Sequence, residues 1–405
     1  MNNTQENHAL VFGASGIVGW AFVNELLSDY PSPNSFSKVT AFTNRRLTPE
    51  QQAQWPASDK LHLVSGLDLI NNDQPAVESA LQSQVSSLGV VTTVYFCAYL
   101  FDADPARETE INIRMLQTTV QALESLCPRF RMLVLPTGIK AYGVHLQTAF
   151  PFSHALPLHE THPQLPEPHA TNLFYTHQHA LLRRLSAYKQ WTYLDLRPDI
   201  VVGFVPNNNG HSLAQWIALY LSLYRYIYGE GAAVGFPGTW KSYSARAQDS
   251  SQDLIARFGI WASLRPGNEV GGESFNIADA DAGKAAPWKD KWPVVCEWFG
   301  LRGVGPEEEG VGAGSKVDIV AFLREHVAER KTMEREFGLN SGHGTPEDGA
   351  SLPHTPGFLQ GGFDFDRPLD LGKAYQLWED RKEERDIRGT WWTAFERYRK
   401  AKIIP

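Results

Sequence analysis

The sequence predicts an α/β fold in which a doubly wound parallel sheet carries a smaller C-terminal lobe. Three observations support this class. Short apolar runs alternate with helix-like stretches through the first half of the chain, which is typical of a parallel sheet flanked by helices. A glycine-rich turn follows the first apolar run, and the alternation stops at a Pro/Asn/Gly stretch in residues 206–210. We therefore expect one domain in residues 1–205, with a later strand returning near 270–280, and the second lobe mainly in residues 206–405.

The elements of the first domain follow from apolar periodicity. Strands are expected where short apolar runs are bounded by turn residues, at residues 8–12, 38–43, 61–64, 90–98, 131–135 and 192–196. Helices are expected where apolar residues recur at helical spacing, at residues 16–27, 76–88, 108–126 and 172–189. The run at 90–98 is almost continuously apolar, as in a strand that is buried on both faces.

The second half has a different pattern. The apolar run at 213–228 is interrupted by Gln215 and Arg225 and is shorter than the ~20 residues that a membrane-spanning helix needs. We interpret it as a buried or pocket-lining helix, with a membrane-surface role as the less favoured alternative. A charged helix is expected at 318–337 and a last helix at 374–402. The glycine-rich stretches at 300–314 and 341–362 predict mobile loops or an inserted segment.

The composition favours a folded protein that acts on small molecules. The 405 residues are 42% hydrophobic and 20% charged, near globular averages, and the net charge of -8 provides no basic field for a nucleic-acid backbone. Three cysteines are too few and too scattered for a disulfide framework or a four-ligand zinc site. Because no secretory signal opens the sequence, we expect a cytoplasmic protein.

The strongest motif is the glycine-rich turn at residues 13–19, which follows the first strand and opens a helix. Gly13 permits a tight turn, Gly16 lets the backbone approach a pyrophosphate, and Gly19 lets helix and strand pack closely. This spacing is that of a Rossmann-type domain in extended short-chain dehydrogenases; a tight turn without a ligand is the alternative. The predicted phosphate-binding residues are Gly13, Ser15, Gly16, Ile17, Val18 and Gly19.

The second strand is followed by Asn44, Arg45 and Arg46, where an NAD-preferring protein usually offers an acidic residue to the ribose. Guanidinium groups suit a 2′-phosphate, so we predict NADP(H), with a solvated basic turn as the alternative. Asp68, just after the third strand, matches the acidic residue that contacts adenine in many such dehydrogenases. On its own it would be an ordinary cap or turn carboxylate.

The usual catalytic pair of short-chain dehydrogenases, Tyr-x-x-x-Lys, is absent. The helix after the fifth strand contains Tyr175, but His179 occupies the lysine position. A lysine, Lys140, instead lies directly after the fifth strand, between Thr137 and Tyr142 in the run TGIKAY.

With these motifs the sequence resembles the progesterone 5β-reductase/iridoid synthase-like enone reductases over most of its length. That family has the glycine-rich turn, two arginines after the second strand, a Thr-Gly-x-Lys-His-Tyr motif after the fifth, and an Asn-Phe-Tyr-Tyr helix start. Here Ala141 replaces the motif histidine and Phe174 the first helix tyrosine, and a long glycine-rich insertion precedes Asp364. These departures indicate a distant member whose substrate pocket has changed more than its cofactor turn.

The resemblance implies hydride delivery from NADPH to the β-carbon of an α,β-unsaturated carbonyl. It gives Tyr175 the role of stabilising the enolate oxygen, and makes Lys140 the candidate for lowering the pKa of that phenol and for binding the nicotinamide ribose, with Thr137 also at the cofactor. A homodimer is possible. The second lobe would hold the substrate, with Tyr142, Trp216, Tyr220, Phe236 and Trp240 as candidate pocket residues; an aromatic stripe at helical spacing is, however, more often core.

Other functions remain open at this point, because a fold does not decide among them. The scaffold could serve a ketone reductase, an epimerase-like enzyme, or a non-redox protein that keeps NADP as a structural or sensing ligand. The four histidines His154, His159, His162 and His169 lack ligand spacing with a carboxylate, so we expect a solvated loop and no metal.

Overall fold

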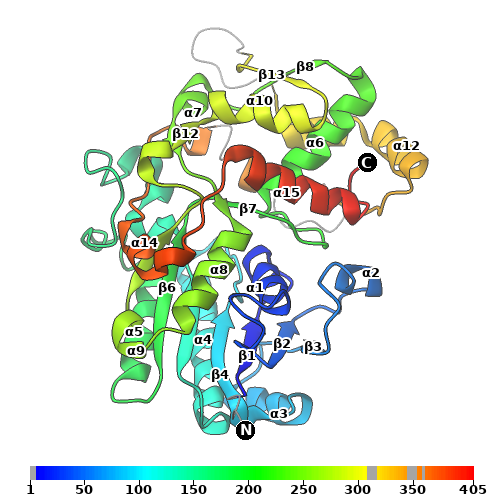
Figure 1. The fold of residues 1–405 in the computed structure, drawn as a ribbon. Coiled ribbons are helices and arrows are strands. Elements are labelled where there is room, and N and C mark those ends of the chain that lie inside the picture. Colours follow the sequence, from blue (N-terminus) through cyan, green and yellow to red (C-terminus); the bar gives the residue numbers. More distant parts are fainter. Residues whose placement is uncertain (1–5, 308–316, 344–353, 358–360) are drawn as a thin grey trace.

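The computed structural model describes the chain except residues 1–5, 308–316, 344–353 and 358–360 (Figure 1). A seven-stranded parallel sheet forms one half of the molecule, with the strand order β11-β6-β5-β4-β1-β2-β3. Its strands are β1 (His8–Phe12), β2 (Lys38–Thr43), β3 (Leu61–Ser65), β4 (Val91–Phe96), β5 (Met132–Pro136), β6 (Thr192–Pro198) and β11 (Ser274–Ile277). The predicted doubly wound sheet is therefore confirmed.

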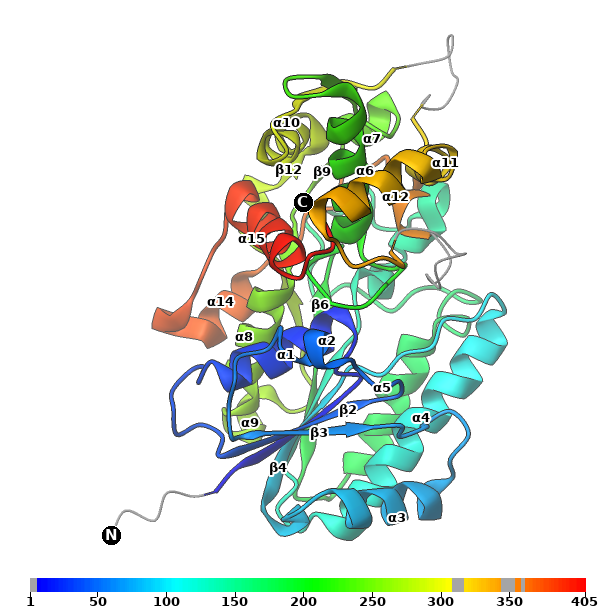
Figure 2. The same cartoon turned by 90° about the vertical axis from the view of Figure 1, so that its right-hand side faces the viewer.

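Helices cover both faces of this sheet (Figure 2). One face carries α1 (Ile17–Leu27), α8 (Gln252–Ser263) and α14 (Gly372–Trp378); the other carries α3 (Gln74–Gln84), α4 (Pro105–Leu126) and α5 (Phe174–Ser186). Successive side chains of β1 point to opposite faces, so Ala9 and Val11 join the first core while Leu10 and Phe12 join the second. Apolar contact on both faces explains why β1 is buried along its whole length.

The second lobe sits beyond the carboxyl ends of the strands (Figure 1). Its longer helices are α6 (Leu213–Tyr228), α10 (Trp288–Trp298), α11 (Ile319–Glu325), α12 (Val327–Phe337) and α15 (Ile387–Lys400). Short elements complete the described chain: α2 (Pro49–Gln52), α7 (Trp240–Ser244), α9 (Gly267–Val270), α13 (His354–Gly357), and the strand pairs β7 (Val201–Val202) with β10 (Ser250–Ser251), β8 (Ala233–Gly235) with β13 (Arg302–Val304), and β9 (Arg246–Ala247) with β12 (Ala286–Pro287).

Several expected elements differ in extent. The charged helix at 318–337 is divided into α11 and α12 at His326, and the last helix at 374–402 is divided into α14 and α15. Helix α6 has the predicted bounds, and the described residues hold no helix long and apolar enough to cross a membrane. The chain after residue 205 also returns to the sheet, since α8, β11 and α14 pack there. Of the glycine-rich stretches, residues 308–314, 344–353 and 358–360 lie outside the described residues.

Candidate functional site

The glycine-rich turn joins β1 to α1 at the carboxyl end of the sheet. Gly13 has φ +76°, and a Cβ there would lie 2.6 Å from the carbonyl group of Cys97. A Cβ on Gly19 would lie 2.2 Å from the Gly13 carbonyl oxygen. Both positions therefore require glycine, because no side chain fits between the turn, α1 and the end of β4. This close packing at Gly13 and Gly19 agrees with a turn that lets a ligand approach the N-terminus of α1.

A cavity of about 500 Å³ opens beside this turn, within the size range of small-molecule sites. The cavity lies at the carboxyl end of β1, which has β2 as its neighbour on one side and β4 on the other. The strand order reverses at this point, and such a point is the usual ligand position in open α/β sheets. Segments following four strands and the loop 207–211 of the second lobe enclose it. Its lining includes Phe12, Gly13, Ser15, Gly16, Phe42, Thr43, Asn44, Arg45, Leu67, Leu69, Ile70, Cys97, Ala98, Tyr99, Leu100, Phe101, Met115, Asn207, Asn208, Asn209 and His211.

The predicted cofactor residues divide into two groups at this cavity. Those that line it are Gly13, Ser15, Gly16, Asn44 and Arg45. Ile17, Val18 and Gly19 form the first turn of α1 instead, and Arg46, although exposed, lies outside the lining. Thr137 and Lys140 also lie outside it, in the segment after β5.

Asp68 caps its own turn. One carboxylate oxygen accepts hydrogen bonds from the backbone N–H groups of Ile70 at 2.9 Å and Asn71 at 3.1 Å, and the other accepts from the Asn71 side chain at 2.7 Å. The side-chain hydrogen bond from Asn71 contributes most to lowering the pKa of Asp68. The carboxylate is thus used by the turn that carries cavity residues, and its contact with adenine stays a prediction.

Tyr175 is the second residue of α5, and its hydroxyl lies beside the segment that follows β5. The position of a Cβ on Gly138 would be only 3.5 Å from the Tyr175 hydroxyl oxygen. The Tyr175 hydroxyl therefore lies in contact distance of Gly138, whose φ is +153°. The structure thus brings Tyr175 close to the turn that contains Thr137 and Lys140.

An aromatic row connects Tyr175 to the cavity. The Tyr175 ring packs edge-on against Phe174, with ring centroids 4.5 Å apart, and Phe174 stacks on Tyr99 at 5.4 Å. Tyr99 lines the cavity and donates a hydrogen bond of 2.5 Å to Glu108. Tyr175 thus lies one aromatic ring away from the cavity wall.

The charges around Tyr175 differ from those expected. Burial raises the pKa of the Tyr175 phenol well above its ordinary value, and the negative charges of Asp195 and Glu108 raise it further. Lys140 is not among the groups that shift the Tyr175 pKa here; it is half-buried and contributes, after burial, to lowering the pKa of His145 to about 4. Its role at the phenol and at the nicotinamide ribose stays a prediction. The raised pKa keeps the Tyr175 phenol protonated at neutral pH, so its hydroxyl can donate a hydrogen bond.

His179, at the position of the missing lysine, binds a buried carboxylate. Its Nε2 lies 3.1 Å from Oδ2 of Asp195 on β6, whose side chain is 0% exposed. Arg197 Nε donates to the same oxygen at 2.7 Å, and the Thr137 hydroxyl donates to the other. Burial alone would raise the pKa of Asp195, but His179 and Arg197 outweigh burial and hold this pKa below its ordinary range. The sequence interpretation missed Asp195, although a carboxylate within an apolar strand is itself a signal.

The candidate substrate residues do not meet at the cavity. Trp216, Tyr220 and Phe236 are at most 2% exposed and belong to the main hydrophobic core. Tyr142 is also buried and donates a hydrogen bond to Asn276 at 2.6 Å, whereas Trp240 is 49% exposed and packs against Gly305. None of these five residues lines the cavity beside the glycine-rich turn, whose aromatic side chains are Phe12, Phe42, Tyr99 and Phe101, and their place in a substrate pocket stays a prediction.

The histidine-rich loop has its own contacts. His162 bonds the carbonyl group of Ala155 at 2.9 Å, and His159 lies 2.8 Å from the Thr161 hydroxyl. Across the described part of the chain, no group of three or more His, Cys, Asp or Glu side chains is arranged to hold a metal ion.

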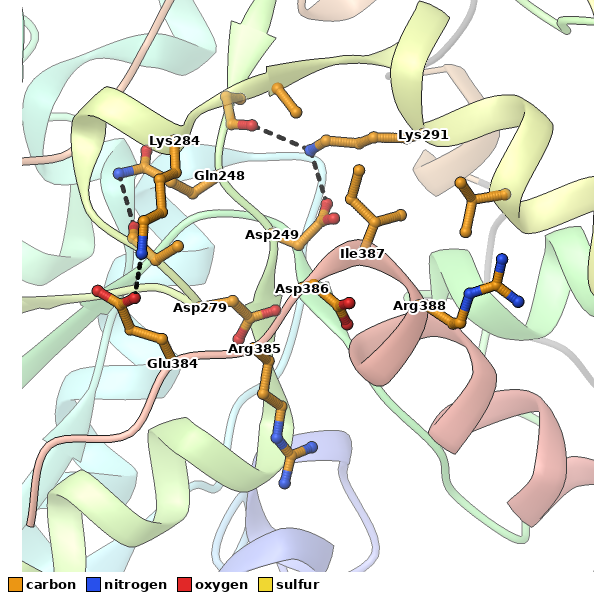
Figure 3. A pocket seen from close by; sticks show the side chains of 14 residues that line it. Gln248, Asp249, Asp279, Lys284, Lys291, Glu384, Arg385, Asp386, Ile387 and Arg388 are labelled. Atoms are coloured by element: carbon orange, nitrogen blue, oxygen red, sulfur yellow. Dashed lines mark hydrogen bonds and ion pairs between the residues drawn. The ribbon is translucent and has the colours of Figure 1, made fainter.

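A second cavity, of about 510 Å³, lies between α10, the start of α15 and the segment after β11 (Figure 3). Its charged side chains already have partners: Lys291 binds Asp249 at 2.8 Å and Lys284 binds Glu384. Asp279 in its wall is buried. None of the predicted site residues lies here.

Comparison with known proteins agrees with this architecture. Residues 9–405 match the PRISE-like Rossmann-fold domain. The short chain dehydrogenase ausT of Aspergillus calidoustus is 34% identical over 98% of this chain and 94% of its own length. The 3-oxo-Delta(4,5)-steroid 5-beta-reductase of Arabidopsis thaliana is 28% identical over 82% of this chain and 78% of its own.

Among solved structures, the UDP-glucose 4-epimerase of Bifidobacterium longum in complex with NAD+ and UDP superposes with a TM-score of 0.60. It is 12% identical and covers 97% of this chain and 98% of its own, so this likeness concerns the fold alone. The match over nearly the whole sequence, together with the turn at residues 13–19 and Tyr175 beside Gly138, places the chain in the PRISE-like family of Rossmann-fold proteins.

Proposed function

We propose that the protein is an NADPH-dependent reductase of an α,β-unsaturated carbonyl compound in small-molecule metabolism. The observation that carries this proposal is the phenol of Tyr175, which holds its proton and points to Gly138 one aromatic ring from the cavity. The relative named as a 3-oxo-Delta(4,5)-steroid 5-beta-reductase supports it, since a ketone conjugated to a double bond is the substrate in that name.

The residues present fit a dinucleotide phosphate. A Cβ on Gly13 would lie 2.6 Å from the Cys97 carbonyl group and one on Gly16 would lie 3.3 Å from the Gly13 carbonyl oxygen, so the turn is closely packed, and the N-terminus of α1 would receive the diphosphate. Arg45 is exposed at the cavity wall and would bind the 2′-phosphate, while Asn44 offers an amide beside it. Bound NADPH supplies the hydride for the reaction.

Tyr175 then acts on the substrate oxygen. Negative charge grows on that oxygen as the β-carbon is reduced, and a donor placed in advance stabilises the charge where water is excluded; one such donor is worth about 2.7–4 kcal/mol in other enzymes. Burial and two carboxylates raise the pKa of Tyr175, so the phenol is protonated and can donate a hydrogen bond to the enolate oxygen. In this step the tyrosine acts as the hydrogen-bond donor to the growing charge.

The test is NADPH consumption with a panel that pairs each enone with its saturated ketone, for the wild type and Tyr175→Phe. We expect consumption with enones only, and a loss of about 10²–10³-fold in kcat in the variant. The affinity of Tyr175→Phe for NADPH should equal that of the wild type, since Tyr175 does not line the cavity. Tyr95→Phe is the control, because it removes a buried hydroxyl that bonds Ser263 in the core.

Two results would change the proposed function. Consumption with the saturated ketones would indicate a carbonyl reductase. Tight NADPH binding without consumption for any pair would favour a non-redox role for the dinucleotide.

A further inference from the structure

Asp195 binds three segments of the chain at one buried carboxylate. The Thr137 hydroxyl reaches it from the turn after β5, His179 from α5, and Arg197 from β6 itself. The side chain of Asp195 is fully buried, and those of His179 and Arg197 are 18% and 16% exposed. Hydrogen bonds between charged groups in such surroundings are directional and strong.

Two of these segments carry the residues of the proposed active site. Thr137 directly precedes Gly138, against which the Tyr175 hydroxyl lies, and Lys140 follows in the same turn. His179 lies one helical turn after Tyr175 on α5, so both side chains project from the same face of the helix. A displacement of Asp195 would therefore move Tyr175 relative to Gly138.

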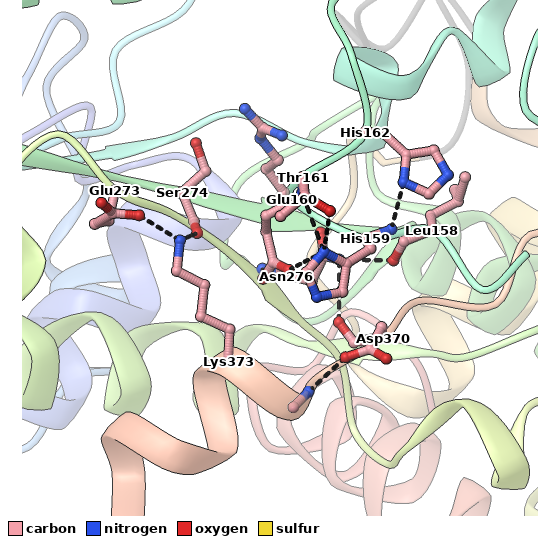
Figure 4. Close-up of polar contacts among 12 residues, drawn as sticks. Leu158, His159, Glu160, Thr161, His162, Glu273, Ser274, Asn276, Asp370 and Lys373 are labelled. Atoms are coloured by element: carbon pink, nitrogen blue, oxygen red, sulfur yellow. Dashed lines mark hydrogen bonds and ion pairs between the residues drawn. The ribbon is translucent and has the colours of Figure 1, made fainter. Parts of the chain in front are cut away.

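Arg197 extends the contact network to a rigid anchor. Its Nη1 lies 3.4 Å from the Tyr142 hydroxyl, which donates to Asn276 Oδ1 at 2.6 Å. The Asn276 amide donates to the carbonyl groups of Leu158 at 2.9 Å and Asp370 at 3.1 Å (Figure 4). Arg197 is thus held from its far side, and Asp195 cannot shift without breaking several bonds.

We propose that Asp195 is the positioning residue of the active site: it fixes α5 and the turn after β5 relative to each other, so that the Tyr175 hydroxyl meets the substrate oxygen. This inference rests on the proposed function, in which Tyr175 is the donor. In this arrangement His179 binds Asp195 and does not take the place of the missing lysine at the cofactor. The charge of Asp195 also acts on Tyr175 directly, as the raised pKa of the phenol indicates.

The main test is Asp195→Asn, which keeps an acceptor for Thr137 but removes the charge that binds His179 and Arg197. We expect kcat to fall by up to about 100-fold, as for a small misplacement of a catalytic group, with little change in KM or in the Kd for NADPH. The matched control is Asp253→Asn. Asp253 is equally enclosed and binds two arginines, Arg385 at 2.9 Å and Arg397 at 2.8 Å, but it lies on α8, away from Tyr175.

A second readout does not need turnover. The ring signals of Tyr175, followed by NMR of ring-labelled tyrosine and assigned with Tyr175→Phe, should shift in Asp195→Asn and stay in place in Asp253→Asn, because only Asp195 holds α5 and the turn after β5. If the wild type reduces none of the panel, this measurement still tests whether Asp195 fixes the surroundings of the phenol. Unchanged Tyr175 ring signals in Asp195→Asn would overturn the proposal.

Two milder variants keep the proposal testable if Asp195→Asn does not fold. Thr137→Val removes the hydrogen bond to the turn after β5, and His179→Gln removes the imidazole contact from α5, while the Asp195–Arg197 pair remains. Each should lower kcat per folded molecule. Full kcat in both variants, or a kcat in Asp195→Asn equal to that of Asp253→Asn, would show that Asp195 only stabilises the fold.

Discussion

Arg45→Ala should weaken NADPH binding while leaving NADH binding in place. Arg45 follows β2 and lines the cavity, whereas its neighbour Arg46 is equally exposed but lies outside the lining. A hydrogen bond to a charged group contributes about 1.5–3 kcal/mol, and solvent and salt reduce this for an exposed side chain toward the lower end. Since 1.4 kcal/mol is a factor of ten in affinity, we expect an increase of roughly tenfold in the Kd for NADPH.

The assay is a fluorescence titration of each reduced dinucleotide against wild type, Arg45→Ala and Arg46→Ala. The difference between NADPH and NADH should shrink in Arg45→Ala and persist in Arg46→Ala, and added salt should weaken NADPH binding most in the proteins that keep Arg45. Equal weakening of both dinucleotides in Arg45→Ala would refute a contact with the 2′-phosphate. An equal effect of Arg46→Ala would refute the argument from the cavity lining.

Two further predictions concern the turn and the second cavity. Gly19→Ala places a Cβ 2.2 Å from the Gly13 carbonyl oxygen, so it should lower the melting temperature and abolish dinucleotide binding; Gly283→Ala, whose Cβ meets no atom within 4 Å, should do neither. Burial raises the pKa of Asp279 to about 7. The folded protein then holds a proton that the unfolded chain releases near pH 4, so stability should fall by roughly 1.4 kcal/mol per unit as pH rises from 4 to 7. The free energy of unfolding of Asp279→Asn, measured by denaturation between pH 4 and 7, should not show this fall. An equal dependence on pH in the variant and the wild type would mean that the Asp279 carboxyl group is ionised in the folded protein.

The sheet was predictable because its signals are local. Strands β1 and β2 and helix α6 have the expected bounds, since apolar periodicity and the residues that end each run lie within a few positions of each other. The division of 318–337 at His326 and of 374–402 after Trp378 was not predictable. At the second break Glu379 adopts φ +54°, a backbone conformation that no local sequence pattern predicts.

The candidate site was predictable where it depends on backbone sterics and not where it depends on tertiary packing. Glycines 13 and 19 are required by contacts within one turn, so the pattern alone identifies them. Trp216 and Phe236 are predicted as pocket residues because the resembled family builds its substrate pocket in the second lobe, whereas the packing of α6 and of the segment after β8 directs them into the core. Among the aromatic residues that line the cavity, Tyr99 contacts α5 through Phe174, so its position depends on how the segment after β4 meets α5.

Because His179 occupies the position of the usual lysine, the groups that shift the pKa of Tyr175 differ from those of the Tyr-x-x-x-Lys pattern. In the Tyr-x-x-x-Lys pattern a cation lowers the pKa of the phenol and prepares it to transfer its proton. Here His179 occupies that position and binds Asp195, and burial together with the negative charges of Asp195 and Glu108 raises the pKa of the phenol instead. An enolate needs charge stabilisation while its oxygen remains unprotonated, and a firmly protonated phenol provides that by hydrogen bonding alone. In the proposed mechanism Asp195 therefore acts by holding α5 and the turn after β5 in place and not by its charge, because that charge opposes negative charge on the substrate oxygen. Asp195→Asn should accordingly lower the rate through the loss of these contacts.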